Sequence, residues 1–421
     1  MAGRMQSQLR RLWQAEPALT ATGLLMLGLL PAFAAGLVLD SRVVTGAPVW
    51  LKPAKFAASI GIYTLTLAWT FQWLRDWRLR RVVGWGTAAM LMLEIAVIGG
   101  QAARGTSSHF NVGTPLDAAL FATMGLAIVA QTFLGAAVAL ALWRARPADL
   151  VMGRALAIGL TITVIGASLG GLMTQPTAVQ REALARTGRM AVSGAHTVGA
   201  QDGGAGLPGT GWSVRHGDLR VPHFVGLHAF QAVPLMAFLI ARRGWPRAVQ
   251  LRLITLAGAS YTGFLGILTW QALRGQSILS PDALTLTAFA VLVAIATFAA
   301  VVMLLGSPWP QPRGVRTARR MGSLSRLRST GWQLGSPRRP HAWHSAPAGR
   351  PLSGVDLSLR PGGVAALHGS PRPARPQLAR RGYGRPSVNR MSCQLLGNSE
   401  GLPHSGRDGG GNPLGVAWSG R

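Results

Sequence analysis

The chain has 421 residues, of which 49% are hydrophobic and only 13% are charged, and its mean hydropathy is +0.28. Soluble domains carry about 25% charged residues, so this composition argues against an ordinary soluble domain. The net charge of +29 would suit a nucleic-acid-binding protein, but the arginines cluster between long apolar runs, as they do in membrane loops. We therefore expect a multi-pass protein that contacts the lipid bilayer and binds no specific nucleic acid.

Eight apolar segments are each long enough to cross a bilayer as a helix, which takes about 20 residues. They cover residues 18–39, 52–74, 81–102, 117–143, 150–173, 223–242, 250–272 and 283–305. In lipid, each segment must satisfy its own backbone hydrogen bonds, so the expected fold class is all-α, a polytopic membrane helix bundle over residues 1–306. The first segment is longer than the apolar core of a signal peptide and is expected to remain as a transmembrane helix. Pro31 and Pro234 indicate kinks.

Arginine-rich segments alternate with the apolar ones and predict the orientation. They precede residue 18, recur at 75–81, 144–154 and 241–252, and end with 313–320. With eight spans they all fall on one side, which the positive charge of cytoplasmic loops identifies as the cytoplasm. We expect a bacterial inner-membrane protein with both termini in the cytoplasm and an extracytoplasmic loop at 175–222.

That long loop has two recognisable parts. Residues 178–189 predict a short surface helix, and residues 199–212, "GAQDGGAGLPGTGW", form a flexible glycine-rich stretch. Loops of this length are usually functional or disordered. His196, beside the glycine-rich stretch, carries less functional weight than the other histidines.

Two pairs of segments indicate an internal repeat. "QAARGTS" (101–107) resembles "QALRGQS" (271–277), and "LKPAKF" (51–56) resembles "LRVPHF" (219–224), with nearly the same separation along the chain. The first pair is soon followed in both cases by Pro, Asp and Ala. The eight spans are therefore predicted to form a four-plus-four pseudo-repeat, and sites in duplicated membrane proteins often lie between the halves.

The only two lysines, Lys52 and Lys55, stand at the outer start of the segment 52–74. Arg104, Arg220 and Arg274 lie at outer ends of other predicted helices. Positive charge on this side runs against the orientation rule, so it requires another reason. An anion in an outward-facing polar pocket is one reason, and pairing with lipid headgroups or nearby acids is the alternative.

Glu94 stands in the middle of the segment 81–102, and Gln101 follows seven residues later on the same helical face. Ionisable groups inside spans are usually functional. The corresponding position in the second half is Phe264. Glu94 is predicted to be a proton carrier or the counter-charge of a ligand, or else to close an internal ion pair with Lys55 or Arg104.

The segment 215–231 is the densest polar cluster and contains His223, His228 and Gln231. Imidazole is a common ligand of haem and metals, and a b-type haem could be held by His109 with His223 or His228. The same histidines could instead protonate a ligand or only hydrogen-bond to loops. His223 and His228 are five residues apart, so they do not form the i, i+4 pair that binds zinc, and no metal site is predicted.

These features lead to one leading function and two alternatives. The leading hypothesis is binding or transport of a small anionic solute or lipid headgroup. Its site residues come from both halves: Lys52, Lys55, Glu94, Gln101, Arg104, Arg220, His223, His228, Gln231, Gln271 and Arg274. The alternatives are a membrane haem-binding or quinone-linked oxidoreductase, with haem b as cofactor, and a structural assembly partner. Catalytic residues and the oligomeric state stay open.

After residue 306 the composition changes. Residues 307–421 are rich in Arg, Pro, Gly and Ser and show no helical or strand periodicity, so they cannot bury a core and are predicted to be disordered. A shifted reading frame in a GC-rich coding sequence would give similar text, which makes a frameshifted end the alternative. The single cysteine, Cys393, excludes an intramolecular disulfide.

Overall fold

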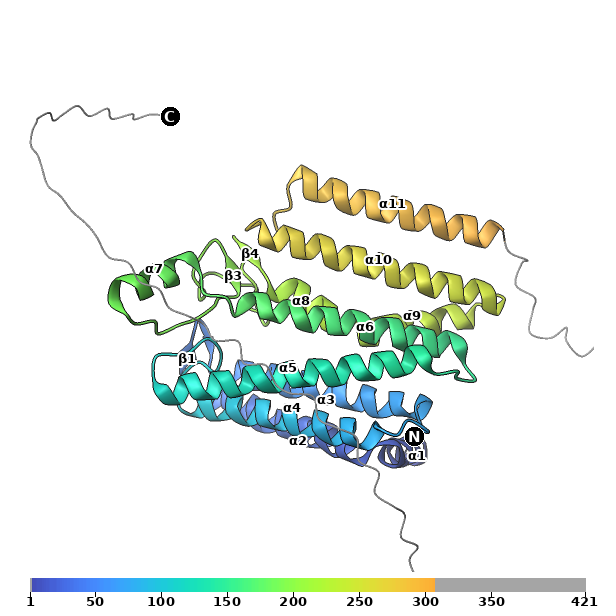
Figure 1. Cartoon of the computed structure of the whole chain (residues 1–421), viewed down its shortest axis with the longest axis horizontal. Coiled ribbons are helices and arrows are strands. Elements are labelled where there is room, and N and C mark those ends of the chain that lie inside the picture. Colours follow the sequence, from blue (N-terminus) through green and yellow to red (C-terminus); the bar gives the residue numbers. More distant parts are fainter. Residues whose placement is uncertain (1, 307–421) are drawn as a thin grey trace, which may run out of the picture. The chain divides into compact units, whose positions relative to one another are not determined.

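The computed structural model describes residues 2–306, which form a bundle of long helices (Figure 1). The predicted tail, residues 307–421, lies outside the described residues. The elements are α1 (Ala2–Ala15), α2 (Pro17–Leu39), β1 (Val43–Val44), β2 (Ala47–Pro48), α3 (Leu51–Thr70), the 3-10 helix η1 (Phe71–Trp73), α4 (Arg80–Ala103), α5 (Pro115–Arg144), α6 (Leu150–Met173), α7 (Ala178–Thr187), β3 (Thr197–Val198), β4 (Gly217–Asp218), α8 (Arg220–Leu227), α9 (Ala229–Arg242), α10 (Arg247–Leu273) and α11 (Ala283–Leu305).

Six of these helices are long and apolar enough to cross a membrane, namely α2, α4, α5, α6, α10 and α11. The pair α8 and α9 passes the same test as one span, although it is bent by 46°. The expected helical architecture is therefore confirmed in part, with six or seven helices within residues 2–306 that are able to span a membrane. The structure does not confirm the predicted eighth span. The helix α3 contains two lysines and several threonines, and its hydropathy is lower than that of the helices that qualify as candidate spans.

The helices follow the predicted segments closely, with two exceptions. The segment 52–74 is helical only to Thr70 and then tightens into η1. The span expected over 223–242 is built from two helices, because α8 begins at Arg220 and the chain bends at His228 before α9. The break does not coincide with the expected kink at Pro234, which lies inside α9.

Contacts from α6 and α10 stabilise the break between α8 and α9. The Thr163 hydroxyl lies 3.3 Å from the carbonyl oxygen of Gly226 and 3.2 Å from that of Leu227, and it accepts the N–H of Phe230. The Tyr261 hydroxyl donates to the Val225 carbonyl at 2.7 Å. A broken helix is tolerated in a membrane when neighbours satisfy the backbone groups that it frees.

A close approach of glycines makes these contacts possible. A Cβ on Gly166 of α6 would lie 2.5 Å from the Cα of Gly226 in α8, which no real side chain tolerates. Glycine at both positions lets the two backbones touch. This contact also places His223, one turn earlier in α8, against the Gly166 carbonyl.

The helices pack in an order that follows the chain. α4 lies against α2, α3 and α5, α5 lies against α6, and α6 in turn contacts α8, α9 and α10. One core cluster joins both sides of the bundle and includes Leu67, Phe71, Leu142, Leu156 and Phe230. The outermost helix, α11, packs on α10 (Figure 1), and none of its most apolar stretch is buried within the described residues. Such a surface suits contact with lipid.

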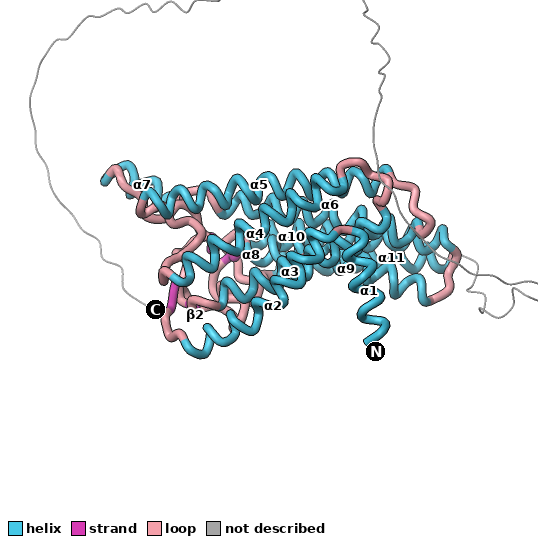
Figure 2. The backbone as a smooth tube through the Cα atoms, turned by 90° about the horizontal axis from the view of Figure 1, so that it is seen from below, coloured by secondary structure: helices cyan, strands magenta, loops and turns pink. Residues whose placement is uncertain are grey.

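The short strands and α7 gather at one end of the bundle, and α1 lies at the opposite end (Figures 1 and 2). β1 pairs with β2 and β3 with β4, both antiparallel. The helix α7 lies within the stretch where we expected a short one, and a capping box at Thr177 and Gln180 starts it. The long loop 175–222 thus has a defined course at the end where the site lies.

Candidate functional site

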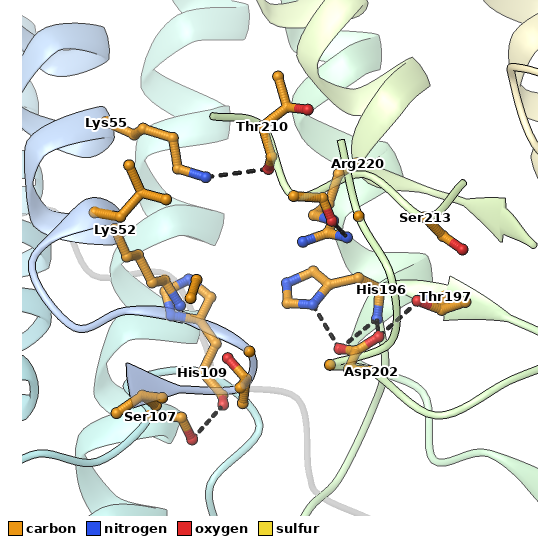
Figure 3. Close-up of a pocket in the computed structure, with 18 of the residues that line it drawn as sticks. Lys52, Lys55, Ser107, His109, His196, Thr197, Asp202, Thr210, Ser213 and Arg220 are labelled. Carbon is orange, nitrogen blue, oxygen red and sulfur yellow. Dashed lines mark hydrogen bonds and ion pairs between the residues drawn. The ribbon is translucent and has the colours of Figure 1, made fainter. Parts of the chain in front are cut away.

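A cavity of about 640 Å³ opens at the strand-bearing end of the bundle (Figure 3). We call it the loop-end pocket. Its walls are the β1–β2 hairpin, the first turns of α3 and α8, the loop 106–109 and the glycine-rich segment 200–211. Its apolar floor includes Ile98 and Ala102 of α4 and Met173 of α6. The pocket therefore lies between helices that precede and follow the α5–α6 connection.

Basic side chains enter the pocket from both sides. Lys55 Nζ donates to the Thr210 carbonyl at 3.1 Å, and Arg220 pairs with the buried Asp218 at 2.5 Å. Lys52 differs from both. Its Nζ lies 6.0 Å from the centre of the Phe56 ring, and within residues 2–306 no carboxylate or hydrogen-bond acceptor contacts it. The Lys52 ammonium is therefore a cation that a ligand in the pocket can reach.

His196 and Asp202 form a hydrogen-bonded pair on the loop side of the pocket (Figure 3). The His196 Nδ1 to Asp202 Oδ2 distance is 2.6 Å, and the same carboxylate accepts the backbone N–H groups of His196 and Thr197. Burial alone would raise the pKa of Asp202, but these hydrogen bonds outweigh it and lower the pKa. Asp202 is therefore ionised.

Burial lowers the pKa of His196, although the Asp202 carboxylate acts in the opposite direction. A neutral His196 that donates from Nδ1 keeps a lone pair on Nε2. Such a nitrogen can accept a hydrogen bond or a proton from a bound molecule. Sequence reasoning gave His196 little weight and missed Asp202. The available signal was that Asp202 is the only acid in the glycine-rich stretch 199–212.

His109 reaches the pocket from the loop between α4 and α5. Its Nδ1 lies 3.1 Å from the Ser108 hydroxyl, and its Nε2 lies 3.5 Å from Glu94 Oε1. Burial and the nearby Lys52 ammonium lower the pKa of His109 well below its ordinary value. The next residue, Phe110, has a φ of 65°, a strained conformation for an aromatic residue, and its buried ring packs edge-on to His196. Backbone strain of this kind concentrates at functional sites.

Glu94 lies beneath the pocket and is only 2% exposed. Its expected ion pair with Lys55 or Arg104 does not form, because Lys55 binds the loop carbonyl of Thr210 and Arg104 binds Asp117. The neighbour in ion-pair range is His109. Glu94 Oε2 has no hydrogen-bond partner within the described residues, so one face of this carboxyl group is open to other partners.

Gln101 and Arg104 belong to a separate network at the end of α4. Arg104 Nη1 lies 2.7 Å from Asp117 Oδ1, and Gln101 Nε2 donates to the same oxygen at 2.8 Å. Asp117 is buried, so these bonds satisfy a carboxylate that would otherwise be isolated. Neither Gln101 nor Arg104 lines the loop-end pocket.

Gln271 and Arg274 make the corresponding turn at the end of α10, also away from the pocket lining. Arg274 pairs with Asp282, and Gln271 Nε2 donates to the Ser277 carbonyl at 3.0 Å, as Gln101 does to that of Ser107 at 3.4 Å. The glycine after each arginine has a positive φ, 70° at Gly105 and 73° at Gly275. The two similar sequence motifs thus build turns of the same construction.

The remaining predicted residues divide between the pocket and the core. His223 lines the pocket, and its Nδ1 is bound to the Gly166 carbonyl at 2.8 Å. His228 lies outside the lining, where it stacks on Phe224 at 4.0 Å. Gln231 donates to the Thr66 hydroxyl at 3.3 Å and so links α9 to α3.

The pocket therefore combines some predicted residues with others that were not expected. The predicted residues in its lining are Lys52, Lys55, Arg220 and His223, together with His109 from the haem alternative. Within residues 2–306, no group of three or more His, Cys, Asp or Glu side chains is placed to hold a metal ion. In comparisons with known proteins, the chain matches no family model, no curated protein and no solved structure at a significant level.

Proposed function

We propose that this protein binds a small anion in the loop-end pocket and carries it into or across the membrane. The observation that carries this proposal is the Lys52 ammonium, which faces the cavity without a carboxylate partner. Lys55 and Arg215 also line the cavity, whose lining contains one carboxylate, that of Asp202, while the lining residue Arg220 is neutralised by Asp218. An excess of positive charge in a concave, partly enclosed site attracts anions.

The hydrogen-bonding groups narrow the class of anion. His196 and His223 each use Nδ1 for a protein acceptor, so in the neutral form each keeps a lone pair on Nε2. These nitrogens accept hydrogen bonds, whereas the lysines donate them. A ligand that combines a carboxylate or phosphate with a hydroxyl group satisfies both. A free hydroxy acid, a sugar phosphate and a glycerophospholipid headgroup share this chemistry.

The membrane arrangement supports the same proposal if α3 is counted as an eighth span. α3 has 20 residues, packs against α2 and α4, and buries Thr64 and Thr70, whose hydroxyls bond within the helix. A helix inside a bundle needs less hydropathy than one that faces lipid. Two four-span halves, α2–α5 and α6–α11, would then flank the pocket, which would face the extracytoplasmic side of a bacterial inner membrane.

Thermal-shift measurements on the detergent-purified protein test the binding site. Inorganic phosphate, glycerol 3-phosphate and lactate represent free anions, and phosphatidylglycerol micelles represent a headgroup. We expect at least one probe to raise the melting temperature of the wild type, and Lys52→Gln to weaken binding about tenfold, as expected for a lost charge-assisted hydrogen bond. Arg78→Gln, at the other end of the bundle, serves as the control. An equal shift in Lys52→Gln and wild type would overturn the proposal.

A haem-binding protein is a second candidate, because His109 and His223 both line the loop-end pocket. His228 is no longer part of this alternative, since it lies outside the lining. The visible spectrum of protein expressed with haem supplied distinguishes the two functions. A Soret band that disappears in both His109→Ala and His223→Ala would favour haem, and its absence from the wild type would eliminate this candidate.

A further inference from the structure

A line of buried polar side chains follows one face of α4. Thr87, Glu94 and Gln101 are spaced by seven residues, which returns a helix to nearly the same face after two turns. All three are buried, with exposures of 0%, 2% and 1%. Gln101 is satisfied by Asp117. The Thr87 hydroxyl and Glu94 Oε2 have no hydrogen-bond partner within residues 2–306, and both residues lie on the part of the helix that runs from the pocket towards the opposite end of the bundle.

Unpartnered atoms within residues 2–306 concentrate along this line. Five buried side-chain oxygens have no hydrogen-bond partner, and four of them belong to Glu16, Thr87 and Glu94. Thr87 is unusual among the buried threonines of the first helices. Thr20 and Thr64 each donate to the carbonyl four residues earlier, whereas the Thr87 hydroxyl does not. Native proteins rarely leave buried polar groups unsatisfied, so such groups point to a function or to bound water.

Glu16 lies at the other end of the line, immediately before α2. It occupies the N-cap position and is fully buried, but its side chain makes no full capping hydrogen bond and has only a weaker contact with the Ala18 N–H. Asp149 holds the same position before α6, and its carboxylate accepts the N–H groups of Val151 and Met152. A carboxylate placed only to start a helix would behave as Asp149 does. Capping therefore leaves both Glu16 carboxylate oxygens without a full hydrogen bond within residues 2–306.

The Glu16 carboxyl group is directed at α4. A Cβ on Gly84 would lie 2.5 Å from Glu16 Cδ, so the carboxyl group rests on the Gly84 backbone, one turn before Thr87. Burial raises the pKa of Glu16, and the guanidinium groups of Arg80 and Arg81 act in the opposite direction. A buried carboxyl group with a raised pKa, beside the two arginines that begin α4, is suited to take up and release a proton.

We propose that protons pass along this face of α4 between Glu94 and Glu16, by way of Thr87 and bound water, and that this transfer is coupled to the anion in the loop-end pocket. This inference rests on the proposed function. At the pocket end Glu94 faces His109 from the loop and Lys52 from α3, and at the far end Glu16 faces Arg80 and Arg81. Each transfer breaks one O–H bond on the proton donor and forms one on the acceptor, and no bond between heavier atoms changes.

The distance between the two glutamates along α4 is too long for direct proton transfer, so the route requires bridging groups. Ten residues separate Gly84 from Glu94, or about 15 Å at 1.5 Å per residue. Leu91 stands between Thr87 and Glu94 on the same face and is buried. Water molecules must therefore bridge the stretch beside Leu91, and the Thr87 hydroxyl, which can both donate and accept, connects them to Glu16.

Proton flux in proteoliposomes tests the route. The full chain is reconstituted with a pH-sensitive dye inside, a potassium diffusion potential is imposed, and inorganic phosphate or glycerol 3-phosphate is added outside. We expect anion-dependent proton flux in the wild type and a loss of about 100-fold in Glu16→Gln and Thr87→Val, the scale of a lost positioned proton carrier. Glu182→Gln, a carboxylate 65% exposed on α7, and Thr123→Val, on the exposed side of α5, are the matched controls.

Anion-induced thermal shifts on the same variants separate this inference from the binding proposal. Glu16 and Thr87 lie away from the pocket, so their substitution should not change anion binding. Variants that keep the thermal shift of the wild type but lose proton flux support the route. Equal shifts and equal flux overturn the route and leave anion binding in place. Proton flux that depends on Glu16 without any anion shift overturns anion binding instead. Thr87→Val removes no charge, so it keeps the test valid if Glu16→Gln fails to fold.

Discussion

The two sides of the loop-end pocket share a construction and differ in chemistry. Both α4 and α10 end in a turn with a glutamine bonded to a loop carbonyl, an arginine paired with an aspartate, and a glycine of positive φ. On the α2–α5 side, however, Lys52 and Glu94 keep unused polar atoms. On the α6–α11 side the corresponding charge, Arg220, is fully engaged by Asp218.

This difference indicates a division of labour. Side chains that are already paired hold the α6–α11 side together, and the broken helix α8–α9 is braced by Thr163 and Tyr261. Unpaired groups on the α2–α5 side cost stability and are retained where function needs them. Substitutions at matched positions should therefore affect stability on one side and activity on the other.

The largest effect is expected at the glycine contact of the α6–α11 side. Gly166→Ala places a Cβ 2.5 Å from the Gly226 backbone, so α6 and α8 must separate. We expect a loss of about 3 kcal/mol in the free energy of unfolding, at the upper end for overpacking. Gly171→Ala, on the same helix with no atom within 4 Å of the new Cβ, is the control. Denaturant unfolding in detergent measures both, and similar values would disprove the close contact.

The next comparison sets a paired carboxylate against an unpaired one. Asp218 is 3% exposed, pairs with Arg220 and accepts the Ser213 N–H, so Asp218→Asn should destabilise the protein by about 3 kcal/mol. Glu94→Gln removes no direct hydrogen bond and should leave stability unchanged or raise it. The same unfolding assay applies. A clear loss of stability in Glu94→Gln would instead favour the structural assembly alternative.

A smaller difference in stability is expected between substitutions in the turn that ends α4 and substitutions in the turn that ends α10. The Asp117 side chain is 6% exposed, whereas that of Asp282 is 39% exposed. Arg104→Ala leaves a buried carboxylate short of a partner, but Arg274→Ala leaves one that water can solvate. The melting temperature should therefore fall further in Arg104→Ala. Equal decreases would show that the difference in burial has no energetic consequence.

The pH dependence of stability should be the mildest effect. Burial lowers the pKa values of His109 and His196 below the ordinary value of 6.5. The unfolded chain then binds protons at a higher pH than the folded protein does, so stability is present above about pH 6.5 and decreases below it. Melting temperatures measured from about pH 8 to about pH 5 should decline less steeply in His109→Gln. A wild-type profile without any decline would contradict this prediction.

Several features followed from the sequence because they depend on local physics. The length of an apolar run determines whether a helix can cross a bilayer, so six of the eight predicted segments became helices with nearly the predicted ends. The placement of lysine and arginine at helix ends also pointed to a polar site, and Lys52, Lys55, Arg220 and His223 do line one pocket.

Tertiary structure decided which polar groups are partnered. The His196–Asp202 pair depends on the course of a glycine-rich loop, which has no periodicity to read. The break at His228 depends on backbone contacts between Gly166 and Gly226, sixty residues apart in the chain. No sequence pattern marks Glu16, and only packing against Gly84 in the fold buries it. Hydropathy and charge determine where a segment lies, whereas the partner of each polar atom is set by distant residues that meet only in the folded bundle.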